Sequence, residues 1–167
     1  MTYTTSSIAF AGIDQMFHAL NGILDKAAAH AKTAGVEETV YTTWRLAPDM
    51  FAMAKQVQIA TEIAARGLTR LSGAEPPSYP DTETTFAQLK ERIAKAHAHI
   101  KDLDKAKIDS DPDGDITFPL GQEKMTMKRR QYLMNFVLPN VYFHTTAAYL
   151  NLRNAGVPLG KSDFLAR

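Results

Sequence analysis

The sequence has no cysteine, almost no net charge and no long apolar run, and each shortage excludes a class of function. Without cysteine the chain forms no disulfides, no thiolate metal sites and no cysteine nucleophile. Its 19 basic and 18 acidic residues give a net charge of +1, too little to attract nucleic-acid phosphates. No uncharged run approaches the ~18 apolar residues that a membrane span needs. We therefore expect neither nucleic acid nor membrane as a partner.

What the sequence does contain suits one globular domain. Hydrophobic residues make up 45% of the 167 positions, which is enough to fill a core. The first seven residues have neither the basic start nor the apolar stretch of a secretory signal. These features predict a single cytoplasmic domain that covers residues 1–167.

Four segments repeat apolar residues every three or four positions, which is the spacing of one helix face. Glycine, proline and capping residues mark their ends. The first segment ends at Gly35, and the second runs from near Pro48 to Leu71. The third follows a cap at Asp81 or Thr82 and reaches Leu103, and the fourth runs from Arg129 to Ala155. Short alternating stretches at 116–118 and 124–127 flank Gly121 and predict a hairpin. Together they predict an all-α four-helix bundle with a short β-hairpin between the third and fourth helices.

The last of these helices places two polar side chains on the face that should point inward. Asn140 and His144 lie one turn apart in an otherwise apolar stripe. Buried polar groups need hydrogen-bond partners, and Gln56 falls on the buried face of the second helix. Pro139 lacks the amide hydrogen that the Asn135 carbonyl would accept, so we expect a kink there. The hypothesis is a small wet cavity bordered by this polar pair.

Two interpretations of His144 remain open. The first is a core histidine satisfied within a hydrogen-bond network. The second is a general base, because an imidazole titrates near neutral pH, although no second catalytic group accompanies it.

Five short motifs are spread over nearly the whole chain. They read LAPDM at 46–50, QVQ at 56–58, LPN at 138–140, FHTTA at 143–147 and GKSDF at 160–164. Together with the end of the last helix, from Tyr149 to Pro158, they resemble the DinB/YfiT-like superfamily. The likeness is greatest to a branch known only as a domain of unknown function. The resemblance implies a DinB-like four-helix bundle, often paired into homodimers.

Metal-binding members of that superfamily hold a divalent ion with three histidines, one on helix two and an HxxxH pair on helix four. By this resemblance His144 matches the second histidine of the pair. Asn140 stands at the first position and Gln56 at the position on helix two. Two amides are poor substitutes for imidazole as ligands of zinc or nickel, so we expect no metal cofactor. The alternative is Zn or Ni held by His144 with Asn140 and Gln56.

Three functions compete on this basis. The first is binding of a small polar molecule by Gln56, Asn140 and His144, within a degenerate metal site. Trp44, Met53 and Tyr149 are the candidate apolar walls of that site. The second is a divalent-metal-dependent thiol transferase or hydrolase of the superfamily. The third is a structural homodimer that binds no ligand and whose polar core fixes helix register.

An aspartate-rich loop offers a further candidate metal site. Asp109, Asp111, Asp113 and Gly114 match the first half of a calcium-binding loop. The twelfth position of that motif is Leu120, where a bidentate glutamate should stand. We therefore interpret this loop as a solvated turn.

Overall fold

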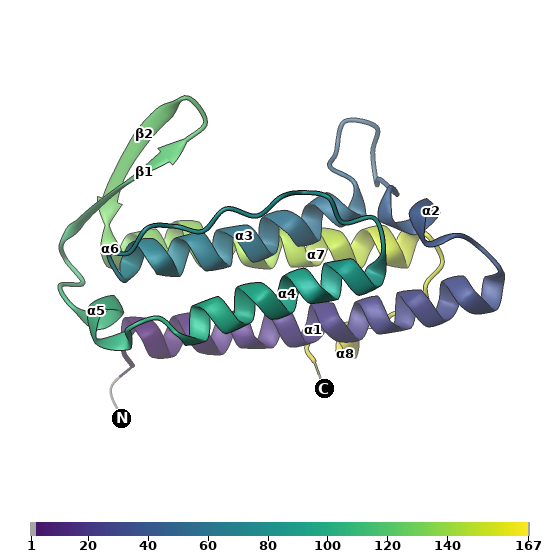
Figure 1. Ribbon diagram of the computed structural model, residues 1–167, viewed down its shortest axis with the longest axis horizontal. Helices are drawn as coiled ribbons and strands as arrows, with labels where there is room; N and C mark the ends of the chain where they lie inside the picture. The colour runs from purple at the N-terminus through teal and green to yellow at the C-terminus, as the bar shows by residue number, and fades with distance from the viewer. Residues whose placement is uncertain (1–2, 167) are drawn as a thin grey trace.

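The computed structural model describes residues 3–166 and consists mainly of helices, with one small antiparallel sheet. Four helices of at least 16 residues lie side by side along the long axis of the molecule (Figure 1). They are α1 (Thr5–Ala34), α3 (Met53–Leu71), α4 (Phe86–Lys101) and α7 (Leu138–Asn154). Helices α1 and α3 each pack against both α4 and α7, so the apolar stripes face a shared core. The prediction of a mostly helical chain is thereby confirmed.

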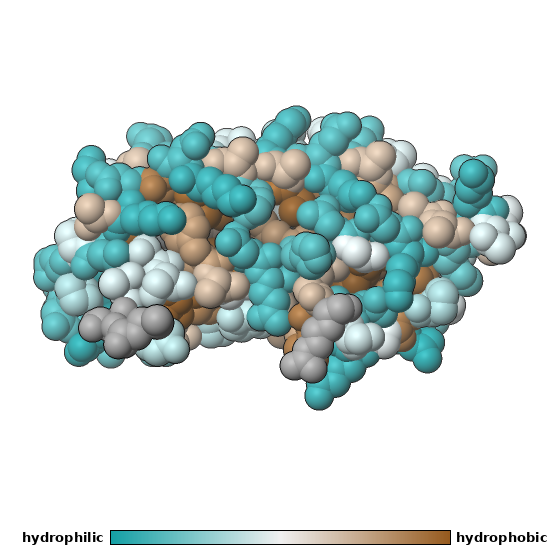
Figure 2. Space-filling view, turned by 90° about the horizontal axis from the view of Figure 1, so that it is seen from below, coloured by the Kyte–Doolittle hydropathy of each residue, from teal (hydrophilic) through white to brown (hydrophobic). Residues whose placement is uncertain are grey.

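Shorter elements connect and cover these helices. They are α2 (Glu38–Thr42), α5 (Lys105–Asp109), β1 (Asp115–Leu120), β2 (Glu123–Lys128), α6 (Arg129–Gln131), the π-helix η1 (Tyr132–Val137) and α8 (Lys161–Phe164). Strands β1 and β2 form a hairpin that projects from one end of the molecule (Figure 1). Viewed over α1 and α8, polar side chains cover most of the surface and hydrophobic ones show between them (Figure 2). Within the described residues no helix combines the length and apolarity that crossing a bilayer requires.

Helix α1 has the boundaries that local chemistry favours. The Thr4 hydroxyl accepts a hydrogen bond from the Ser7 amide, and the Ser7 side chain bonds back to the Thr4 backbone. The helix ends at Gly35, whose φ of 66° lies in the left-handed region that glycine adopts without a steric penalty. The side chains of Ile13 and Phe17, from the predicted stripe, are buried in the core.

Two helices begin later than the sequence predicts. Helix α3 begins at Met53 and not near Pro48, because the preceding segment is a loop in which the Trp44 carbonyl accepts the Met53 amide hydrogen. Helix α4 is capped by Thr85 in a capping box with Gln88, and not by Asp81 or Thr82.

The predicted helix from Arg129 to Ala155 is three elements, α6, η1 and α7. Pro139 has no amide hydrogen, so the helix cannot continue its regular bonding through that position. The Leu138 amide bonds instead to the Leu133 carbonyl, five residues back, which is the spacing of a π-helix. The distortion expected at Pro139 thus takes the form of a widened turn in front of it.

The aspartate-rich loop disperses its carboxylates. Asp109 accepts hydrogen bonds from the amide and hydroxyl of Ser6, at 2.6 and 2.7 Å. Asp113 pairs with Arg130 at 2.9 Å, and Asp115 pairs with Lys128 at 2.7 Å. Asp109 thus joins α5 to the first turn of α1, and the two ion pairs hold the base of the hairpin together.

A buried arginine holds the proline-rich connector between α3 and α4 in place. The side chain of Arg92 is 1% exposed, and its Nε donates to Thr61 Oγ1 at 2.9 Å. Its Nη1 donates to the Pro80 carbonyl at 3.0 Å and forms ion pairs with Asp81 and Glu83 at 3.0 and 3.2 Å. One guanidinium therefore joins two helices and the connector, and its charge is compensated as burial requires.

Helices α3 and η1 approach each other closely at Gly67. A Cβ atom built there would lie 2.7 and 2.9 Å from the two methyl carbons of Val137. We predict that Gly67→Ala lowers the free energy of unfolding by about 1–3 kcal/mol, because overpacking forces the two elements apart.

Gly22→Ala is the matched control for this substitution, since a Cβ at Gly22 meets nothing within 4 Å. Alanine favours a helix interior over glycine, so this variant should gain about 0.5–1 kcal/mol. Urea unfolding measures both. Equal changes in the two variants would show that the Gly67 contact does not limit the packing.

Candidate functional site

The candidate site contains a hydrogen bond between α3 and α7, formed by Gln56 and His144. The Nδ1 atom of His144 lies 2.7 Å from Oε1 of Gln56. His144 is 8% exposed and Gln56 is 2% exposed. The structure therefore brings together the histidine and the helix-two amide that the sequence paired.

The protonation state of this pair follows from its surroundings. Nε2 of Gln56 donates to the Phe51 carbonyl at 3.2 Å, which turns Oε1 toward the imidazole. An amide oxygen only accepts hydrogen bonds, so Nδ1 of His144 carries the proton. Burial lowers the pKa of His144 below its usual 6.5, which keeps the ring neutral at pH 7. In this tautomer Nε2 presents a lone pair and acts as an acceptor.

Asn140 lies one turn before His144 on the same side of α7, but its amide serves its own helix. Its Nδ2 donates to the Phe136 carbonyl at 2.7 Å. The side chain is partly buried and satisfies a carbonyl of the π-helix beside Pro139. The structure therefore does not bring Asn140 into the hydrogen bond between Gln56 and His144.

The three predicted wall residues lie in different places. Met53 is fully buried in the first turn of α3, one turn before Gln56. Trp44 is partly exposed, and its Nε1 donates to Asn154 Oδ1 at 2.9 Å. Tyr149 lies elsewhere, because its ring packs edge-on against Phe164 of α8, with centroids 6.2 Å apart.

A second buried amide extends the polar face of α7 toward Trp44. Asn151 lies two turns beyond His144, and its Nδ2 donates to the Ala147 carbonyl at 2.9 Å. Its Oδ1 is buried without a hydrogen-bond partner among the described residues. Buried acceptors are normally paired, and this oxygen is an exception that is enclosed in the core, since Asn151 is 0% exposed. Asn151 is not among the predicted site residues, although it stands seven positions after His144 and thus on the same helix face.

The residues at this site do not fit a divalent metal ion. No group of three or more histidine, cysteine, aspartate or glutamate side chains with metal-site geometry occurs among the described residues. Of the three positions considered, Gln56 has its oxygen on the imidazole and Asn140 donates to its own helix. One imidazole nitrogen is too small a ligand set for zinc or nickel.

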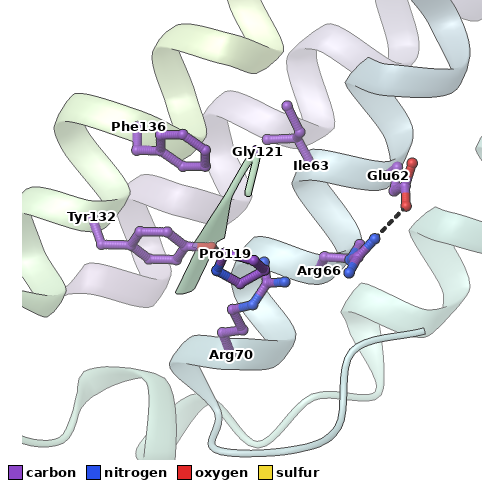
Figure 3. Close-up of a pocket in the computed structure, with 8 residues that line it drawn as sticks. All are labelled: Glu62, Ile63, Arg66, Arg70, Pro119, Gly121, Tyr132 and Phe136. Carbon is purple, nitrogen blue, oxygen red and sulfur yellow. Dashed lines mark hydrogen bonds and ion pairs between the residues drawn. The ribbon is translucent and has the colours of Figure 1, made fainter. Parts of the chain in front are cut away.

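A separate hollow of about 310 Å³ lies between α3, the hairpin and η1, and none of its lining residues is among the predicted site residues. Figure 3 shows Tyr132 and Phe136 on one side and Arg66 with Glu62 on the other. Tyr132 and Phe136 stand four positions apart in η1, and both line the hollow. The sequence does indicate that Arg66 and Arg70 project from one helix face, since they stand four positions apart.

The comparisons with known proteins agree with this architecture. A family model described as "Domain of unknown function (DUF1993)" matches residues 6–165. A DinB family member protein from Shewanella denitrificans, known from its crystal structure, is 34% identical to this chain in sequence. It superposes with a TM-score of 0.87 over 96% of this chain and 93% of the other. Among the curated proteins none matches significantly. The chain therefore belongs to the DUF1993 family of domains of unknown function and is DinB-like in structure.

Proposed function

We propose that this protein is a DinB-like four-helix bundle whose degenerate site works without metal and binds a small polar molecule between α3 and α7. The observation that carries the proposal is the buried pair of Gln56 and His144, with Nδ1 of the imidazole 2.7 Å from the amide oxygen. This bond fixes the ring and its tautomer and leaves Nε2 as a preorganised acceptor.

The chemistry of the site selects the kind of ligand. Nε2 of His144 accepts hydrogen bonds, because Nδ1 donates to Gln56. A molecule with hydroxyl, amide or amine hydrogens complements this acceptor, whereas a carboxylate does not. Trp44 is 36% exposed and supplies apolar surface near the start of α3. The ligand class is therefore a small hydrogen-bond donor.

The proposal includes pairing of two chains in the cytoplasm. Phe143 and Leu150 lie seven positions apart on one outer face of α7, and Phe51 lies in the loop before α3. Phe143 and Phe51 are 60% and 53% exposed, respectively. Large apolar side chains exposed together are typical of a surface that a second subunit covers.

Ligand binding and metal content test the first part of the proposal. We expect untagged protein to contain far less than one zinc or nickel ion per chain by elemental analysis. Nicotinamide, acetamide, ethanolamine and inositol provide a first panel of donors. At least one should raise the melting temperature of the wild type, because a ligand of the native state stabilises it.

His144→Leu should abolish that rise, and the exposed residue His18 provides the control His18→Leu, which should keep it. A stoichiometric metal ion that is lost in His144→Leu would establish the metal-dependent alternative in place of this proposal. No change in melting temperature with any donor would favour a structural homodimer.

The assignment of a neutral state to buried His144 predicts a pH dependence of stability. Burial lowers the pKa of folded His144, so below pH 6.5 the unfolded chain binds a proton that the folded chain does not. The free energy of unfolding should therefore fall as pH drops from 7 to 5, with a slope of at most about 1.4 kcal/mol per pH unit from this group. Urea unfolding of His144→Gln should have a smaller slope than the wild type, and equal slopes would refute the assignment.

The proposed pairing predicts a mass of two chains by light scattering. Phe143→Lys should give the mass of one chain, because it places a charge within the apolar contact. Met125→Lys is the control, since Met125 is also exposed but lies on the hairpin. A monomeric wild type would eliminate the paired state.

A further inference from the structure

The hollow beside the hairpin combines positive charge with apolar walls. Arg66 and Arg70 rise from successive turns of α3, and Ile63, Phe136 and Pro119 provide the apolar lining. Its volume of about 310 Å³ is at the lower end of the range for ligand pockets. It lies near the C-terminal end of α3, whereas Gln56 lies near the N-terminal end.

The positive charge in this hollow is only partly compensated. Nη1 of Arg66 pairs with Glu62 at 2.7 Å, and Nε of Arg66 is buried with no acceptor among the described residues. Arg70 has no carboxylate partner in the described part of the chain, and its Nη1 donates to the hydroxyl of Tyr132 at 3.2 Å. The hollow therefore contains two guanidinium groups but only one carboxylate, and a bound anion would compensate the remaining positive charge.

The aromatic wall is rigid. The rings of Tyr132 and Phe136 stack with centroids 5.5 Å apart and an interplanar angle of 14°. Phe118 of β1 contacts both rings, at 4.5 and 4.7 Å between centroids. Both stacked residues belong to η1, and π-helical turns occur frequently at functional sites.

The buried hydroxyl of Tyr132 positions one of the two arginines. Tyr132 is 0% exposed, and its hydroxyl accepts a hydrogen bond from Nη1 of Arg70 at 3.2 Å. Burial raises the pKa of Tyr132 above its usual 10, with Arg70 opposing the shift, so the group stays protonated at neutral pH. Arg70 is therefore held at the hollow by a neutral partner that leaves its positive charge uncompensated.

We propose that this hollow binds a small organic monocarboxylate whose carboxylate is held by Arg66 and Arg70 and whose apolar body packs against Phe136 and Ile63. Guanidinium groups match the planar carboxylate with paired hydrogen bonds. The lining carries one net positive charge from Arg66, Arg70 and Glu62, which balances a monoanion and not a phosphate dianion. The binding site is distinct from the one at His144.

Titration followed by ¹H–¹⁵N NMR tests this site on the full chain. The probes are benzoate, phenylacetate, indole-3-acetate and hexanoate, with benzamide as the uncharged counterpart of benzoate and inorganic phosphate as a second anion. We expect at least one carboxylate to shift the amide signals of residues 62–70 and 132–136 with a dissociation constant below 1 mM. Benzamide and phosphate should bind at least tenfold more weakly.

Variants separate a built site from general attraction of anions. Arg66→Gln and Arg70→Gln should each weaken carboxylate binding at least tenfold, and Tyr132→Phe should weaken it severalfold. Arg130→Gln removes one positive charge from the exposed pair with Asp113 and should change binding less than twofold. His144→Leu should leave carboxylate binding intact, which keeps the outcome independent of the proposal for the other site.

Two results would overturn the inference. One is the absence of saturable shifts with every carboxylate up to 10 mM in protein that gives a folded spectrum. The other is equal weakening by Arg66→Gln and Arg130→Gln, which would show that only net charge matters. Binding of phosphate in preference to every carboxylate would assign a different ligand to the hollow and would likewise contradict the inference.

Discussion

The packing of α3 against η1 and α7 is the contact on which the rest of the molecule depends. The missing side chain of Gly67 lets Val137 approach the backbone of α3. On one side of this contact Gln56 reaches His144, and on the other side Arg70 reaches Tyr132. Both polar bridges need a fixed separation of the two helices, because hydrogen bonds weaken steeply when they lengthen. A single apolar approach thus sets the geometry of two distant polar sites.

One of the eight prolines, Pro139, contributes to the geometry of both sites. Pro139 cannot donate a backbone hydrogen bond, and the helix widens into η1 in front of it. The widened turn places Tyr132 and Phe136 beside the hairpin. After Pro139 the regular helix resumes and directs His144 toward α3. Asn140, between the two sites, bonds to the Phe136 carbonyl.

The sequence predicts what depends on periodicity and leaves out what depends on contacts between distant segments. Apolar spacing predicts the helical class and the inward face that carries His144, and the buried position of Gln56 indicates its partner. The late start of α4 was not predictable, because Asp81 is a good local cap but is engaged by Arg92 and Lys55. A π-helix has no simple sequence pattern of its own, so the widened turn in front of Pro139 was not predictable, although a distortion there was.

The ion pairs of Arg92 have a consequence for how the molecule opens. The connector between α3 and α4 contains no regular secondary structure, a feature usually associated with easy local unfolding. Lifting it away would leave a guanidinium with 1% of its side chain exposed without Asp81, Glu83 or the Pro80 carbonyl. Releasing the connector therefore costs the least free energy when the helices around Arg92 separate at the same time. We therefore expect this irregular stretch to unfold together with the helices and to resist proteases and amide exchange as they do.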